Sequence, residues 1–198
     1  MYSLEDGKIF VKTARKVIEN YLKTGKTIFP EEIKKYSEKR GIFTTIKKYK
    51  NNELRGCIGF PYPIYPLWKA LVLSAISAAT EDPRFEPLKL EELKEVIIEI
   101  NILSEPELIK VDNPEDYVKN IKIGRDGLIV KYGIFSGLLL PEVPVEEKWN
   151  EIEFLNYTCI KAGLPPNAWL TMPVKIYKFT SQIFREKSPE GEIEEVIL

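Results

Sequence analysis

The sequence predicts an α+β fold in which a mostly antiparallel sheet is flanked by helices. Short apolar runs occur in pairs that are joined by turn residues, which is typical of hairpins. Stretches with helical spacing lie between these pairs, and no repeat, low-complexity run or linker divides the 198 residues. A chain of this length should bury roughly 70% of the surface that its unfolded form exposes, so it needs no disulfide or metal for stability.

The first elements of the chain are expected to be two helices. Ser3 followed by Asp6 is a weaker relative of the usual capping box and predicts a helix start. Apolar residues then recur at helical spacing as far as Leu22, and Gly25 suits the end of that helix. A second, short helix is expected over 31–39.

A β-hairpin and a buried helix are expected next. Residues 41–46 and 54–60 have the composition of strands and are joined near the Lys-Asn-Asn turn at 50–52. The proline-rich segment 61–66 must be a loop, because each proline removes a backbone donor and disfavours helix at the preceding residue. Residues 67–80 are rich in Ala and Leu, which predicts a largely buried helix.

The central strand of the sheet is predicted at 96–103. Its faces are unequal, because Ile98, Ile100 and Ile102 alternate with residues that include polar Glu99 and Asn101. A short helix is expected later in the chain, over residues 114–120.

The C-terminal half is expected to form further strands around one amphipathic helix. The Gly-Arg-Asp-Gly turn at 124–127 separates the runs 121–123 and 128–132, and residues 133–137 turn the chain again into 138–140. The helix is predicted over 145–161, with its apolar stripe formed by Trp149, Ile152, Phe154, Leu155 and Cys159. A late strand is predicted over 174–184, and the acidic tail from about Glu186 is expected to be mobile.

The composition of the chain argues against several classes of function. A formal net charge of −1 argues against a global field for nucleic acid or membrane. No stretch approaches the ~20 apolar residues of a membrane span and the N-terminus is not a signal peptide, so a cytoplasmic location is expected. The chain has no histidine, which excludes Cys-His and Ser-His-Asp catalysis within one chain and disfavours a conventional zinc site. Neither GxGxxG nor GxxxxGK[ST] occurs, and no cofactor or metal is expected.

The two cysteines, Cys57 and Cys159, lie too far apart in the sequence for a metal-binding spacing. Both are expected to be free thiols in a reducing cytoplasm, with Cys159 in the core. A long-range disulfide remains open if the source is a hyperthermophile, and the many Lys, Glu and Ile residues with a single Gln lean that way.

The segment 54–60, Leu-Arg-Gly-Cys-Ile-Gly-Phe, is the strongest candidate for a functional site. Strand alternation places Arg55, Cys57 and Gly59 on one face, and Gly56 and Gly59 suggest close approach of another group to the backbone. In one interpretation Arg55 favours a Cys57 thiolate and backbone N–H groups hold an anion. In the other, Cys57 is a small apolar residue in a packed strand.

Charged residues elsewhere are open to a functional and a structural interpretation. Asp82 and Arg84 either position a polar ligand, or pair with the Arg55 site, or simply end a helix. Glu142 would serve as a base if it were buried or beside Arg55, and is otherwise a solvated loop acid. Asp126 is interpreted as a turn residue.

Residues 34–50 form a basic run in which seven Lys or Arg residues accompany one acid, Glu38. With aromatic residues interleaved, the run is a candidate surface for RNA or a nucleotide. The near-zero net charge favours the alternative, a solvated lysine-rich face, so nucleic acid is not expected as a partner.

The segments above together resemble the AMMECR1-domain family, in the form known from the archaeal and prokaryotic AmmeMemoRadiSam-type protein A. Leu-Arg-Gly-Cys-Ile-Gly at 54–59 is similar to the family signature. The other matching blocks keep their order over nearly the whole chain: 78–79, 82–85, 98–100, 127–130, 137–144 and 161–165. The chain departs from many relatives at Glu142, where they carry Gln.

The resemblance implies more about structure than about function. It implies one domain over 1–198 with two subdomains, an antiparallel-sheet core with helices and a smaller subdomain packed beside it, which leave a cleft. The biochemical activity of the family is not established. Prokaryotic relatives are associated with a Memo-like protein and a radical-SAM protein, which implies a role with protein partners.

Three functional hypotheses follow. The leading one is a binding or accessory protein that acts with partner proteins on an unknown small molecule or modified macromolecule. Its cleft would be lined by Arg55, Gly56, Cys57, Gly59, Asp82 and Arg84. The second is an enzyme with Cys57 as nucleophile or redox thiol, Arg55 depressing the thiol pKa, and Glu142 or Asp82 as base. The third is an RNA-associated protein that uses the 34–50 run.

Overall fold

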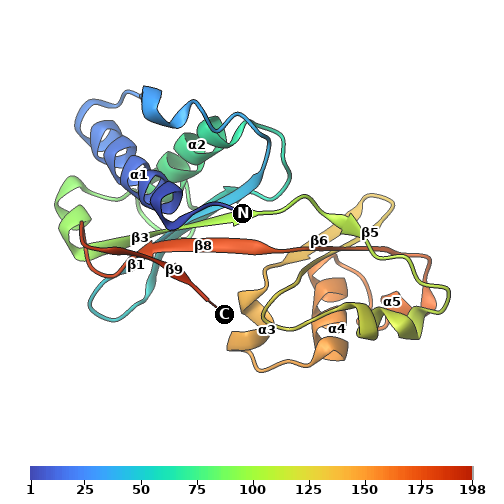
Figure 1. The fold of residues 1–198 in the computed structure, drawn as a ribbon. Helices are drawn as coiled ribbons and strands as arrows, with labels where there is room; N and C mark the ends of the chain where they lie inside the picture. Colours follow the sequence, from blue (N-terminus) through green and yellow to red (C-terminus); the bar gives the residue numbers. More distant parts are fainter. Residues whose placement is uncertain (198) are drawn as a thin grey trace. The chain divides into compact units, whose positions relative to one another are not determined.

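We obtained a computed structural model of the protein, which describes residues 1–197 and contains two compact units (Figure 1). Unit 1 comprises residues 1–103 and 182–197, and unit 2 comprises residues 104–181. Each unit has its own antiparallel sheet and its own hydrophobic core, which confirms the α+β prediction. Among the described residues, no helix combines the length and the apolar character that crossing a membrane requires.

Unit 1 is a five-stranded sheet with helices α1 and α2 on one face (Figure 1). The strand order is β2-β1-β3-β8-β9. The elements are α1 (Leu4–Thr24), η1 (Glu31–Ile33), β1 (Gly41–Lys48), β2 (Leu54–Phe60), α2 (Leu67–Thr80), η2 (Leu90–Glu95), β3 (Val96–Leu103), β8 (Ser181–Glu186) and β9 (Ile193–Val196).

The predicted ends of α1 are confirmed. Ser3 and Asp6 form a capping box in which each side chain accepts from the other residue's backbone N–H. Gly25 ends the helix in the left-handed region at φ 68°, and its N–H donates to the carbonyl of Tyr21. The first helix is therefore determined locally, by residues next to its own ends.

Asp6 also ties the start of α1 to the buried Tyr36. Its Oδ1 accepts from the Tyr36 hydroxyl at 2.6 Å, and its Oδ2 accepts from Ser3 N and Oγ at 2.9 and 2.7 Å. The hydrogen bonds from Tyr36 and then Ser3 lower the pKa of Asp6 to about 2. The folded state thus stabilises the ionised carboxylate.

Asp6→Asn should therefore lose stability in a pH-dependent way. Because the folded pKa is depressed, the stabilisation is fully present above the unfolded pKa of ~3.9 and is lost as pH falls through the folded value. We expect wild type to exceed Asp6→Asn in free energy of unfolding at pH 6, with the difference shrinking between pH 4 and pH 2. Urea titrations at each pH measure this difference in free energy of unfolding, and Glu5→Gln is the control. A difference that stays constant down to pH 2 would contradict the role of the ionised Asp6 carboxylate.

The helix predicted over 31–39 is only a single 3₁₀ turn at 31–33. The chain beyond it provides backbone carbonyls to the start of α2 instead of continuing a helix. Leu67 N donates to the carbonyl of Glu38 at 2.8 Å, and Trp68 N donates to the carbonyl of Tyr36 at 3.1 Å. Tertiary capping of α2 outweighs the local helical preference here.

The hairpin and the buried helix of unit 1 are confirmed at 41–48, 54–60 and 67–80. The strand β3 differs from the prediction in that all eight of its residues are buried, including Glu99 and Asn101. Both faces of this central strand are therefore covered, although one of them is partly polar.

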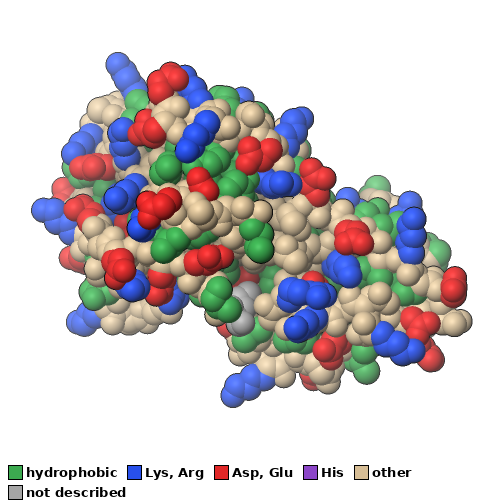
Figure 2. Space-filling model, in the orientation of Figure 1, with side chains coloured by type: hydrophobic (Ala, Val, Ile, Leu, Met, Phe, Trp, Pro, Cys, Tyr) green, Lys and Arg blue, Asp and Glu red, His purple; other side chains and the backbone are tan. Residues whose placement is uncertain are grey.

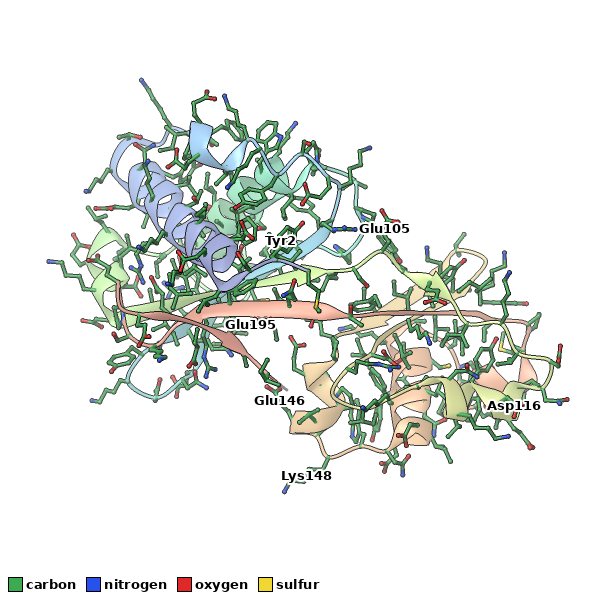
Figure 3. All side chains as sticks on the ribbon, viewed as in Figure 1. Tyr2, Glu105, Asp116, Glu146, Lys148 and Glu195 are labelled. Atoms are coloured by element: carbon green, nitrogen blue, oxygen red, sulfur yellow. The ribbon has the colours of Figure 1, made fainter. Side chains whose placement is uncertain are left out.

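The expectation of a mobile tail from Glu186 is wrong. Glu186 is 2% exposed and accepts from Arg15 Nε and Nη2, both at 2.6 Å, and from Ile98 N at 2.9 Å. Beyond it, β9 pairs with β8. The Gln182 side chain of β8 accepts a hydrogen bond from Tyr2 N at 2.7 Å and donates one to the Glu195 carboxylate at 3.0 Å. Tyr2 and Glu195 are labelled in Figure 3. The C-terminal segment thus completes the sheet.

Unit 2 is a four-stranded sheet with the order β4-β7-β5-β6 and short helices. Its elements are β4 (Glu107–Leu108), η3 (Pro114–Asn120), β5 (Gly127–Tyr132), β6 (Phe135–Leu139), α3 (Glu142–Glu146), α4 (Glu151–Lys161), α5 (Ala168–Thr171) and β7 (Lys175–Phe179). Its core includes Phe154, Leu155 and Cys159, and the prediction that Cys159 is a core residue is confirmed. Neither cysteine of the chain forms a disulfide.

Three predicted elements of unit 2 have different limits. Residues 121–123 form no strand, and β6 begins at Phe135, so the turn before it is shorter than expected. The helix over 145–161 is two helices, because Lys148 adopts φ 58° and Asn150 caps α4 in a capping box with Glu153. Ile152 lies outside the buried stripe and is 50% exposed.

The strand predicted over 174–184 is also two strands, β7 in the sheet of unit 2 and β8 in the sheet of unit 1. The break lies at Thr180, whose N–H donates to Ser104 Oγ at 2.9 Å and whose carbonyl accepts from Ser104 N at 2.9 Å. The alternation of the side chains does not reveal a change of sheet.

Candidate functional site

The candidate segment forms β2, an edge strand that pairs with β1 and has a bulge at Arg55. Ile46 pairs with Gly56 and Lys47 pairs with Leu54, so Arg55 has no residue opposite it. Its guanidinium donates to Glu92 at 2.9 and 3.1 Å and to the carbonyl of Glu86 at 2.9 Å. These hydrogen bonds direct the Arg55 guanidinium to Glu92 and Glu86, whereas the first of the two interpretations of this segment had it favour a Cys57 thiolate.

The thiol of Cys57 is half-buried and hydrogen-bonded. Thr45, directly opposite on β1, donates from Oγ1 to Sγ at 3.3 Å. Burial raises the pKa of the Cys57 thiol above its usual value. The Thr45 hydrogen bond and the charge of Arg84 oppose that shift, whereas the carboxylates of Asp82 and Glu99 add to it. The thiol is therefore kept in its neutral form near pH 7.

Asp82 and Arg84 form the polar centre of the site, in the loop that follows α2. Asp82 is 4% exposed and accepts from Cys57 N at 2.9 Å and from Arg84 Nε and Nη2 at 2.9 and 2.7 Å. The guanidinium of Arg84 holds the pKa of the Asp82 carboxyl well below its usual range. The Arg84 side chain itself is 55% exposed. Its Nη2 also lies 3.4 Å from the carbonyl oxygen of Cys57.

These contacts satisfy the outer edge of β2 at Cys57. An edge strand presents backbone N–H and C=O groups that lack a partner strand. Here a carboxylate accepts from the Cys57 N–H and a guanidinium donates to its C=O. The loop side chains of Asp82 and Arg84 thus take the place of a neighbouring strand, and they fix the loop to β2.

An open depression of about 650 Å³ lies between β2 and this loop. Its lining residues are Lys48, Glu53, Leu54, Arg55, Arg84, Phe85, Glu86 and Glu92. The Phe85 ring lies 5.9 Å from the guanidinium carbon of Arg55 and 5.5 Å from that of Arg84. Phe85 is half-buried and provides the aromatic surface of the depression.

The strand register also brings in residues that the sequence did not single out as site residues. Thr45 pairs with Cys57 on one side and with Glu99 of β3 on the other. Glu99 is 8% exposed, and its Oε2 lies 3.5 Å from Lys47 Nζ. Glu99 could have been noticed from the sequence, because it is the one acid within the isoleucine-rich run of β3. Nothing in the sequence near Thr45 or Glu92 marks either of them as a site residue.

The two glycines of β2 serve close packing. A Cβ atom on Gly56 would lie 2.1 Å from the carbonyl oxygen of Ala78, so α2 contacts the strand backbone there. A Cβ atom on Gly59 would lie 2.2 Å from the carbonyl oxygen of Ile42 and 2.5 Å from the Phe43 ring. The predicted close approach at these glycines is thus made by the protein itself.

The remaining candidate acids belong to unit 2. Glu142 is the first residue of α3. Asp126 is 2% exposed, accepts from Lys122 N at 2.9 Å and binds Arg125 at 2.7 and 2.6 Å, so it closes the turn as predicted.

The basic run over 34–50 is partly neutralised. Lys34 pairs with Glu31, Lys47 with Glu99 at 3.5 Å and Lys48 with Glu53 at 3.1 Å. Each of these acids lies outside the run, which lowers the net positive charge that this surface presents.

Comparison with known proteins agrees with this fold. The AMMECR1 family model matches residues 11–184. Protein MJ0810 of Methanocaldococcus jannaschii is 53% identical over 193 residues, covering 98% of this chain and 96% of that protein. Protein MK0488 of Methanopyrus kandleri is 53% identical over 195 residues, covering 98% and 94%. The crystal structure of the uncharacterized protein PH0010 from Pyrococcus horikoshii is 52% identical, has a TM-score of 0.91 and matches 98% of both chains. The chain belongs to the AMMECR1 family.

Proposed function

We propose that this protein is a binding or accessory protein and that Cys57, Asp82 and Arg84 form its recognition surface. One observation carries the proposal. The buried Asp82 carboxylate holds the Cys57 backbone and the Arg84 guanidinium at once, while half of the Arg84 side chain faces solvent. An arginine that is already oriented loses less conformational freedom when it binds a ligand. The outer edge of Arg84 suits a carboxylate, phosphate or carbonyl group.

The chemistry of the cluster favours recognition over covalent catalysis. Burial raises the pKa of the Cys57 thiol, and the chain has no histidine that would deprotonate it. The low pKa of Asp82 makes its carboxylate a poor base near neutral pH. Arg55 is engaged by Glu92.

An enzyme that uses Cys57 as nucleophile or redox thiol is the second candidate. The hydrogen bond from Thr45 and the charge of Arg84 favour it, because both lower the pKa of the thiol. Burial is the larger effect and acts in the opposite direction, so this candidate ranks below recognition.

The proposal includes protein partners of the Memo-like and radical-SAM classes and a cytoplasmic location. Its support is the association of prokaryotic AMMECR1 relatives with such proteins. In this account the depression beside Arg84 and Phe85 accepts a small molecule or a modified residue that a partner delivers.

Arg84→Gln should weaken binding to the Memo-like protein of the same organism by about tenfold or more, because a pre-oriented charge is removed. Arg125→Gln is the matched control. Arg125 also binds a buried aspartate, Asp126, and its side chain is 52% exposed, compared with 55% for Arg84. In isothermal titration calorimetry, the dissociation constant of Arg125→Gln should stay within about twofold of the wild-type value.

Equal weakening by both variants would contradict the proposed surface. No binding by the wild-type chain would contradict the partner assignment. Thermal unfolding of each variant checks that the fold is intact, and because both variants remove an arginine from a buried aspartate, any loss of stability should be similar in the two.

A further inference from the structure

The tip of the β5–β6 hairpin in unit 2 exposes apolar side chains. Ile134 is 95% exposed, Phe135 45% and Tyr132 37%. Tyr132 pairs with Phe135, so only Gly133 and Ile134 form the turn. Gly133 has φ 56°, and a Cβ atom placed on it would meet nothing within 4 Å. Polar residues usually occupy such turns, and Ile134 gains almost no burial here.

The segments that build this end of unit 2 are basic. Residues 127–141 and 154–181 contain Lys131, Lys161, Lys175 and Lys178 but no Asp or Glu, and the one acid that β4 adds opposite them is Glu107, which faces Lys178. Lys131, next to Tyr132, lies directly opposite Lys175 in the register of β5 and β7. Like charges in that position disfavour the sheet, although Lys131 Nζ lies 5.4 Å from the centre of the Tyr177 ring, which offsets part of that cost. Lys161 ends α4, and its backbone lies against Gly137 of β6.

We propose that this hairpin tip docks on an anionic lipid surface. Ile134 and Phe135 would enter the headgroup region, while Lys131, Lys161 and Lys175 would face the anionic headgroups. Figure 2 shows hydrophobic and Lys or Arg side chains, with an acidic side chain among them, over this part of unit 2. The formal net charge of −1 does not oppose docking, because salt screens charges more than about 8 Å away.

A lipid surface fits these features better than a protein or a nucleic acid does. Three exposed apolar side chains on a convex turn are far fewer than the roughly 20–30 residues per side of a stable protein interface. Weak, reversible docking on a membrane needs only a few apolar and basic groups. Single-stranded nucleic acid binds by stacking on aromatic rings, and Ile134, the most exposed of the three, offers no ring.

Vesicle co-sedimentation of the full chain tests the proposal. We expect binding to vesicles of equal parts phosphatidylglycerol and phosphatidylcholine, loss of that binding at high salt, and none to phosphatidylcholine alone. Ile134→Ser should lower the partition coefficient about tenfold, because the inserted side chain is lost. Lys131→Gln should lower it about fivefold.

Ile152→Ser is the matched control, because Ile152 is 50% exposed in the same unit but lies between Glu151 and Glu153. It should bind as wild type does. The proposal is overturned if wild type does not bind the anionic vesicles, if Ile134→Ser binds as well as Ile152→Ser, or if oligo-dT binds more tightly at the same phosphate concentration. The recognition surface lies in unit 1, so these outcomes leave it unaffected.

Discussion

Glu186→Ala should lower the free energy of unfolding by about 3–5 kcal/mol, the largest effect that we expect from a single substitution. The carboxylate is buried and binds Arg15 at 2.6 Å through both Nε and Nη2, and it also accepts from Ile98 N. Without it, Arg15 keeps only the carbonyls of Leu93 and Val96, both at 2.8 Å, and its charge remains buried. Urea unfolding measures the loss, provided that the dependence of the free energy of unfolding on urea concentration is the same in each variant.

Two further variants separate the buried ion pair from a general effect of removing an acid. Arg15→Met combined with Glu186→Leu removes both charges and should cost less than Glu186→Ala alone, because no buried charge is left unpaired. Glu192→Ala breaks an exposed pair with Lys187 and should have little effect. If Glu186→Ala unfolded no more readily than Glu192→Ala, this account of the buried pair would fail.

Gly56→Ala should have the second largest effect, a loss of about 3 kcal/mol. The new Cβ would lie 2.1 Å from the carbonyl oxygen of Ala78, which belongs to the backbone of α2 and cannot rotate away. The strand and the helix must separate, and Cys57 moves with the strand. Thermal unfolding followed by circular dichroism measures the loss.

Gly25→Ala is the control for backbone strain alone. Gly25 has φ 68° with nothing within 4 Å of its Cβ position, so alanine there meets no clash and should cost about 1–2 kcal/mol. Stability of Gly56→Ala equal to wild type, or better than that of Gly25→Ala, would contradict the close contact between α2 and β2.

Elements with local signals could be predicted from the sequence. The capping box at Ser3 and Asp6, the hairpin around β2 and the helix over 67–80 depend on residues next to one another in the chain. Elements that depend on partners far away in the sequence could not be predicted in this way. Glu186 reaches Arg15 across 171 residues, and its acidic sequence context suggested a solvated tail instead.

The candidate site was predictable in part. Its glycines and its cysteine identified the right segment, but simple alternation failed at Arg55 because a β-bulge inserts this residue without an opposite partner. For Asp82 and Arg84 the sequence left three interpretations open, one of which was a pairing with the Arg55 site. They reach the site through the backbone of Cys57, a contact that no spacing in the sequence encodes.

The pH dependence of Cys57 alkylation by iodoacetamide in the folded chain tests most directly whether this cluster is a recognition surface rather than a nucleophilic centre. Cys159, which is completely buried, should stay unmodified and serves as the internal control. Because burial raises the pKa of Cys57, its alkylation midpoint should lie above that of the same thiol in the unfolded chain, with slow reaction at pH 7. Arg84→Gln should raise the midpoint further, since it removes a positive charge that favours the thiolate. A midpoint below that of the unfolded thiol, with fast reaction at pH 7, would contradict the account and favour a catalytic Cys57.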